Sequence, residues 1–87
     1  MKKLNVDEKT LRLWQQGQRL ILLRTTMKKK QKEIAEALGV DCGNYCHMEK
    51  GRLDAKDKLE KVEQMFIEWR EREINRLQRQ IKNLKDI

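Results

Sequence analysis

The stretch QKEIAEALGVDCGNYCHMEKG, residues 31–51, holds two short apolar patterns with a single glycine between them. The first pattern has helical spacing, and Gly39 supplies the left-handed residue that commonly ends a helix. Asp41 is a favourable N-cap for a second helix, which would run over residues 42–50. The stretch therefore predicts two short helices, over 31–38 and 42–50, joined by a tight turn.

The second of these helices divides into an apolar side and a side of small or polar residues. Tyr45 and Met48 lie three residues apart, so they share one face and would hold the helix to the core. The outward side carries Cys42, Gly43, Asn44 and His47. A helix that lies in the major groove of DNA needs this division, because its outer side chains must face the base edges.

A further helix is predicted upstream of this stretch. Asn5 or Asp7 could cap it, and it would run to about Thr26. One face of it carries Leu13, Leu20 and Met27, each seven residues from the next. A second face carries Leu11, Trp14, Ile21 and Leu22. A helix that is apolar on more than one side is either covered on both sides within its own chain or contacts a partner with one of them.

Downstream, no helix breaker occurs from Ala55 to Ile87, which predicts one long final helix. One apolar stripe on it consists of Leu59, Val62, Phe66 and Trp69. A second stripe, with a seven-residue period, consists of Ile67, Ile74 and Ile81, interleaved with Arg70, Leu77 and Leu84. This second stripe is a heptad seam with Ile at position a and Leu at position d, interrupted by Arg70.

The composition is that of a small, basic, helical protein. A chain of 87 residues suffices for one domain and one appended element. It contains no proline and only four glycines, which argues against an all-β fold built on tight turns. The formal net charge is +7, and residues 1–54 carry most of the excess. Such a surplus favours an acidic partner, namely nucleic acid, an anionic membrane or an acidic protein.

The same sequence disfavours several other classes of protein. No apolar run approaches the length of a membrane span, and no signal-peptide core is present. Structural zinc needs four ligands, whereas the candidates are only Cys42, Cys46 and His47. One histidine and no phosphate-binding glycine loop leave no recognisable catalytic site. We therefore expect no enzymatic activity, no metal, no cofactor and a reduced, cytoplasmic environment.

Three segments, taken in order, carry a resemblance to a known family. They are GQRLILLR (17–24), IAEALGV (34–40) and YCHMEKG (45–51), with Gln31 seven residues after Arg24. Over residues 17–66 this set resembles the phage-repressor and Cro-type helix-turn-helix proteins, also called the XRE family. The resemblance implies an all-α, lambda-repressor-like helix-turn-helix domain of about five helices with an extended C-terminal helix. The DNA-binding domain would span residues 1–66, and the extended helix would span residues 67–87.

The resemblance also implies roles for individual residues. Glu49 would pair with Arg24 at the end of the first helix, and neither residue would be catalytic. DNA would be contacted by Lys28, Lys30, Gln31, Cys42, Gly43, Asn44, His47, Lys50 and Arg52. The basic side chains would neutralise phosphates, which gives affinity and salt dependence, whereas Asn44 can read adenine if its amide reaches the groove.

The sequence departs from the family pattern at the start of both short helices. Lys30 stands where Ser or Thr usually caps the first of them. Cys42 and Gly43 stand where long polar side chains commonly read bases. Direct base readout would therefore rest on Asn44, on His47 and on the flanking basic residues.

Three arrangements are open for the final helix. It could form a homodimeric coiled coil, whose Ile and Leu seam favours two parallel strands; it could fold back over Trp14 and Ile21 of the same chain or of a partner; or it could dock another protein. In a homodimer, the contact residues would be Trp14, Ile21, Ile67, Ile74, Leu77, Ile81 and Leu84. Arg70 inside the seam is the main objection to self-pairing.

Together these patterns predict a sequence-specific regulator of transcription that binds double-stranded DNA, as a repressor or autoregulator. A homodimer would place two recognition helices about 34 Å apart on a pseudo-palindromic operator. The resemblance points to a bacterial, phage or other mobile-element origin. Two alternatives stay open: an antitoxin-like adaptor that binds a protein through the long helix, and a protein that binds nucleic acid through charge alone.

Overall fold

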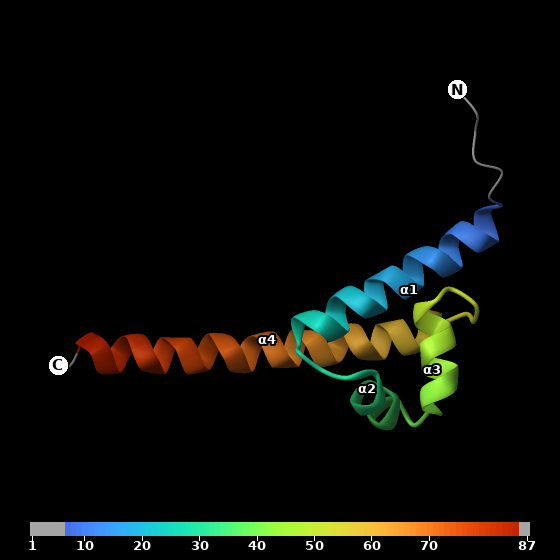
Figure 1. Ribbon diagram of the computed structural model, residues 1–87. Coiled ribbons are helices and arrows are strands. Elements are labelled where there is room, and N and C mark those ends of the chain that lie inside the picture. Colours follow the sequence, from blue (N-terminus) through green and yellow to red (C-terminus); the bar gives the residue numbers. More distant parts are fainter. Residues whose placement is uncertain (1–6, 86–87) are drawn as a thin grey trace.

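The computed structural model describes residues 7–85, which form four α-helices joined by short connections (Figure 1). The helices are α1 (Glu8–Thr26), α2 (Gln31–Leu38), α3 (Cys42–Glu49) and α4 (Lys56–Lys85). No strand occurs within these described residues, so the all-α prediction is confirmed. The expectation of about five helices is wrong for this range. Residues 56–85 contain neither proline nor glycine, so nothing divides the last helix in two.

Side-chain caps fix where two of the helices begin. The Asp7 carboxylate accepts a hydrogen bond from the backbone N–H of Thr10, and Asp41 accepts one from the backbone N–H of Gly43. The alternative cap, Asn5, lies outside the described residues. At α2 the Lys30 side chain makes no capping bond. Instead the Glu33 carboxylate reaches back and accepts from the backbone N–H of Lys30 at 2.9 Å.

The first three helices all end at a residue with left-handed backbone. These residues are Lys28 (φ 59°), Gly39 (φ 70°) and Gly51 (φ 76°). Each end also carries the paired backbone hydrogen bonds of a Schellman motif, such as the bond from the Lys29 N–H to the Arg24 carbonyl. Two of the three positions hold glycine, which adopts this conformation without steric cost, and the third holds lysine.

The hydrophobic core lies between α1, α2, α3 and the first half of α4. Its fully or nearly fully buried members are Leu20, Leu23, Met27, Ile34, Ala35, Leu38, Tyr45, Met48, Ala55 and Val62. The predicted α4 stripe is confirmed, because Val62 is buried and Leu59, Phe66 and Trp69 pack against the same cluster. The predicted inward placement of Tyr45 and Met48 is confirmed as well.

Gly17 allows α1 and α3 to approach each other closely. A Cβ atom at this position would overlap the backbone carbonyl oxygen of Glu49 and lie 2.9 Å from that of Met48. Because both obstacles are backbone atoms, no side-chain rotation could make room. Only glycine therefore fits at this crossing of the two helices.

Two polar contacts join the start of α4 to α1. The backbone N–H of Ala55 donates to Gln16 Oε1 at 2.9 Å, and Arg19 Nε donates to Glu63 Oε1 at 3.1 Å. Beyond Trp69 no described residue of α4 is buried. Residues 70–85, here called the arm, extend past the other helices as the orange-to-red half of α4 (Figure 1). None of the described helices is both long and apolar enough to cross a membrane.

Candidate nucleic-acid interface

An ion pair fixes the C-terminal end of α3 to the end of α1. Arg24 donates from Nε to Glu49 Oε2 at 2.6 Å and from Nη2 to Glu49 Oε1 at 3.2 Å. The exposed fraction of the side chain is 3% for Glu49 and 17% for Arg24. A two-point bond of this kind fixes orientation as well as distance. The predicted pairing of Arg24 with Glu49 is confirmed.

Gln31, the first residue of α2, joins the same group. Its Nε2 atom donates to Glu49 Oε1 at 2.9 Å, so α1, α2 and α3 meet at one carboxylate. We call Arg24, Gln31 and Glu49 the α3 clamp. An amide nitrogen carries two hydrogens, so one remains for a second acceptor. The sequence did not show the contact between Gln31 and Glu49, because the contact depends on how α2 and α3 are placed relative to each other.

The clamp has a settled charge state at neutral pH. Burial opposes ionisation of Glu49, but the hydrogen bonds from Arg24 and Gln31 outweigh it, and the pKa of Glu49 is lowered. The hydrogen bond to Glu49 raises the pKa of Arg24. Burial, reinforced by the nearby Glu49 carboxylate, raises the pKa of Tyr45. Arg24 and Glu49 are therefore both charged, and Tyr45 is neutral.

Tyr45 supplies a polar atom that the sequence gave no reason to single out. Its ring is fully buried, and its hydroxyl makes no hydrogen bond to any described residue. It lies beside the clamp, where it contributes packing to the end of α3 that faces the core.

The other side of α3 is open to solvent. Exposed residues occupy its first turn and the following turn, namely Cys42, Gly43, Asn44 and His47. Cys46 is half-buried, which agrees with a role as a small filler. At Gly43 an added Cβ would meet only the Asp41 carboxylate among nearby atoms, so the surface there is not covered by another element. The division of α3 into buried and outward faces is as the sequence predicts.

Basic side chains flank both ends of the α2–α3 pair. Lys28 and Lys30 precede α2, whereas Lys50 and Arg52 follow α3, and all four are exposed. Two more exposed lysines belong to the same flank but were absent from the predicted site, namely Lys29 and Lys32. The charge run KKKQKE signals both of them. Lys29 also lies 3.8 Å from the Glu33 carboxylate, so part of its charge is offset locally.

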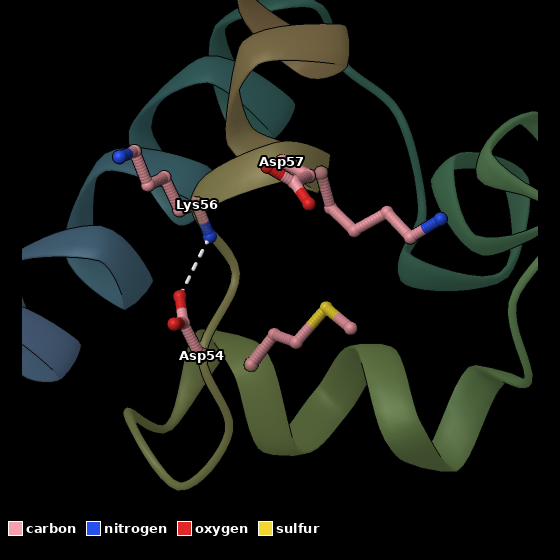
Figure 2. Close-up of a pocket in the computed structure, with 5 residues that line it drawn as sticks. Asp54, Lys56 and Asp57 are labelled. Carbon is pink, nitrogen blue, oxygen red and sulfur yellow. Dashed lines mark hydrogen bonds between the residues drawn. The ribbon is translucent and has the colours of Figure 1, made fainter.

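An open hollow lies between α3 and the start of α4, lined by Met48, Asp54, Lys56, Asp57 and Lys58. Figure 2 shows Asp54 accepting a hydrogen bond from the backbone N–H of Lys56, the first residue of α4, at 2.9 Å. Its two carboxylates and two ammonium groups balance in charge. The hollow therefore adds no net positive charge to that of Lys28, Lys30, Lys50 and Arg52.

Two further features bear on what else the molecule could bind. The described residues hold no group of three or more potential metal ligands, and Cys42 and Cys46 are both free thiols.

Trp14 on α1 is 55% exposed and Ile21 is half-buried. The arrangement in which α4 covers Trp14 within one chain is therefore wrong. α4 packs along the face of α1 that contains Leu20 instead.

Comparison of the chain with protein-family models, with curated proteins and with solved structures gave no match. The function is therefore inferred from the residues and their geometry alone.

Proposed function

We propose that this protein is a sequence-specific regulator of transcription that binds double-stranded DNA through α2 and α3, arranged as a helix-turn-helix. The observation that carries the proposal is the two-sided construction of α3. Its inner side is fixed by Tyr45, Met48 and the α3 clamp, while its outer side is free and bears small or polar groups. A helix held in this way can enter a major groove without losing its place in the core.

The contacts to DNA divide into two kinds. Asn44 and His47, on the exposed face of α3, are the side chains in reach of base edges. Cys42 and Gly43 lie at the exposed start of the same helix and would let the backbone come close to the groove. Lys28, Lys30, Lys50 and Arg52 flank the pair and would neutralise phosphates.

Gln31 is proposed to serve both the fold and the DNA. Gln31 is the first residue of α2, and the positive end of a helix is where a phosphate binds favourably. Loss of Gln31 would weaken DNA binding and loosen the end of α3 together.

The regulator is proposed to act as a homodimer, most simply as a repressor or autoregulator that occludes a promoter. Support comes from the exposed apolar side chains of the arm and from Trp14 and Ile21 on α1. A large exposed apolar surface commonly marks a protein–protein contact.

The decisive experiment is selection of binding sites from random duplex DNA by the purified full chain at about 150 mM salt, near physiological ionic strength. Enrichment of an inverted repeat would support a dimeric, sequence-specific regulator. Asn44→Ala should then lower affinity for the selected site more than affinity for random DNA. Gln18→Ala, which removes an exposed amide from α1 outside the helix pair, is the matched control and should change neither. Equal losses for both DNAs with Asn44→Ala would reduce Asn44 to a structural residue.

A second function is favoured by one specific observation, the exposed seam on the arm. An antitoxin-like adaptor would use that seam to bind another protein, and DNA would be secondary. Selection that enriches no motif from a folded dimer would support this alternative. A steep salt dependence without sequence preference would instead indicate binding through charge alone.

A further inference from the structure

The arm carries an apolar seam that nothing in the described chain covers. Its Ile and Leu side chains are between 46% and 70% exposed, and they are Ile74, Leu77, Ile81 and Leu84. They recur at alternating spacings of three and four residues, so they form one continuous stripe on the helix. This stripe has the pattern by which two helices pair along their length.

Parallel pairing of two arms meets an electrostatic obstacle. In a parallel, in-register coil each residue of the seam faces its own copy, so Arg70 would face Arg70 inside the contact. Along the edges, Glu73 would face Gln78 and Gln80 would face Lys85. The parallel arrangement therefore buries two like charges and gains no pair of opposite charges in return.

An antiparallel pairing removes this obstacle. In one register Ile74 faces Leu84 of the second copy, and Leu77 faces Ile81 of the second copy. The two-fold symmetry repeats both contacts, which gives four apolar layers. Each layer pairs an isoleucine with a leucine, and Arg70 lies outside all four.

The charges at the edges of the arm select the same register. In it Glu71 faces Lys85 of the second copy, and symmetry supplies the reciprocal pair. Among the described residues neither Glu71 nor Lys85 forms an ion pair within the chain, whereas Glu73 is already bound by Arg76 at 2.8 Å. Residues 74–85 also hold four basic and no acidic side chains. Antiparallel pairing brings these basic side chains toward the glutamates that precede residue 74 in the second copy.

We propose that the arm binds the arm of a second copy of this chain in an antiparallel direction, through residues 74–84 and with Glu71 paired to Lys85 of the other copy. The contact is short. Eight half-exposed Ile and Leu side chains bury less area than the roughly 1,600 Å² of a standard interface. The arms therefore dissociate on dilution.

The direction of pairing sets the distance between the two DNA-binding parts. The symmetry centre falls at residue 79, which is 17 residues from Val62 in the core. At 1.5 Å per residue the two copies of Val62 lie about 51 Å apart along the arms, compared with about 34 Å for one turn of DNA. The inference about spacing rests on the proposed function, whereas the direction of pairing does not. We infer half-sites that are separated by more than one helical turn, in place of the one-turn spacing expected from the family.

Charge exchange tests the direction of pairing in the full chain. Glu71→Lys places like charges at both edge contacts and should weaken the dimer about 5- to 10-fold in sedimentation equilibrium. Lys85→Glu should do the same, and the double variant should restore the wild-type dissociation constant. In a parallel pair residues 71 and 85 lie two heptads apart and never meet, so additive losses in the double variant would overturn the proposal.

Spin labels give an independent measure that does not depend on DNA. In a chain with Cys42→Ser and Cys46→Ala, a nitroxide on Glu68→Cys should report a distance above about 33 Å, because antiparallel arms offset the two labels by that much along their axis. A label on Gln78→Cys, next to the symmetry centre, should report a short distance. That short distance would show that the arms pair. Short distances at both positions would mean parallel arms, and no short distance at Gln78→Cys would mean no pairing.

The two sets of results separate this proposal from the proposed function. Antiparallel arms in a protein that selects no DNA motif would refute DNA regulation and leave the direction of pairing intact. A selected operator with half-sites one turn apart would refute the inferred spacing.

Discussion

The body of the molecule, residues 7–69, buries large apolar side chains in a core, whereas the arm leaves side chains of the same kinds exposed. In the body Leu20, Ile34 and Val62 are fully buried, whereas on the arm Ile74 and Leu77 remain about half exposed. The body therefore completes its core within one chain. The arm contributes almost nothing to that core, so its apolar side chains stabilise the protein only when a second surface covers them.

Matched truncations should separate the two regions most clearly. Leu20→Ala should lower the free energy of unfolding by about 3–5 kcal/mol, because it leaves a cavity among fully buried side chains. Leu77→Ala removes the same atoms from the arm and should change the unfolding free energy of the monomer by less than about 0.5 kcal/mol. It should instead weaken self-association, measured by sedimentation. Urea unfolding at low protein concentration measures the unfolding free energies of both variants. Similar losses for Leu20→Ala and Leu77→Ala would contradict the distinction between the body and the arm.

The close contact between α1 and α3 gives the next largest effect. Gly17→Ala should lower the free energy of unfolding by about 3 kcal/mol or more, because the added carbon meets backbone atoms of Met48 and Glu49. The matched control is Gly43→Ala on the outward face, where only the flexible Asp41 carboxylate is in reach. This control should be neutral or slightly stabilising, since alanine favours the helix by about 1 kcal/mol over glycine. Thermal unfolding of both variants, followed by circular dichroism, provides the comparison.

The α3 clamp should show an intermediate effect with a defined pH dependence. Arg24→Leu leaves the buried Glu49 carboxylate without its main partner and should cost about 2–3 kcal/mol at pH 7. The pKa of Glu49 is lowered in the folded state, so its contribution to stability is complete above the unfolded pKa of about 4.5. That contribution is lost as the pH falls below 4.5 through the lower folded pKa.

Unfolding measured between pH 7 and pH 3 tests the clamp directly. The wild-type protein should lose this stability below about pH 4.5, whereas Glu49→Gln should be less stable at pH 7 and flatter in the acidic range. An equal slope for both proteins would exclude Glu49 as the source of the acid sensitivity. Glu60→Gln, which changes an exposed glutamate on α4, is the control and should follow the wild type.

The sequence predicted the helix boundaries of the body well because the ends are set by local chemistry. Asp41 and Gly39 act through atoms two to four residues away, and such contacts can be read from the chain. The bond from Gln31 to Glu49 could not be predicted in this way, because it requires the relative placement of α2 and α3. The same is true of Trp14, whose exposure depends on which face of α1 meets α4.

The number of helices was mispredicted for a related reason. The expectation of about five helices came from a resemblance, whereas the unbroken sequence after Ala55 indicated one long helix, and that second indication is confirmed. For the candidate site, exposure could be predicted from the helical periodicity of residues 42–47. That these side chains touch DNA stays a prediction, since the fold of one chain shows only that they lie on the surface.

The smallest expected effect concerns Lys28, which is at the border between the α1 end and the proposed DNA surface. Its left-handed backbone (φ 59°) is strained for any residue with a Cβ atom, whereas Gly39 and Gly51 occupy the equivalent positions at the ends of α2 and α3. Lys28→Gly should therefore raise the free energy of unfolding by about 0.5–1 kcal/mol, after allowance for the greater freedom of glycine in the unfolded chain.

The same substitution should weaken DNA binding, if Lys28 neutralises a phosphate as proposed. The slope of log K against log salt should become shallower by about 0.9, the value for one lost phosphate contact. Lys61→Gly removes an exposed lysine from within α4; it should lower stability and leave the salt slope unchanged. A gain in stability together with a loss of DNA affinity would show that the strain at Lys28 places a positive charge beside the helix pair. A gain in stability with unchanged DNA binding would mean that the strained backbone at Lys28 has no role in DNA binding.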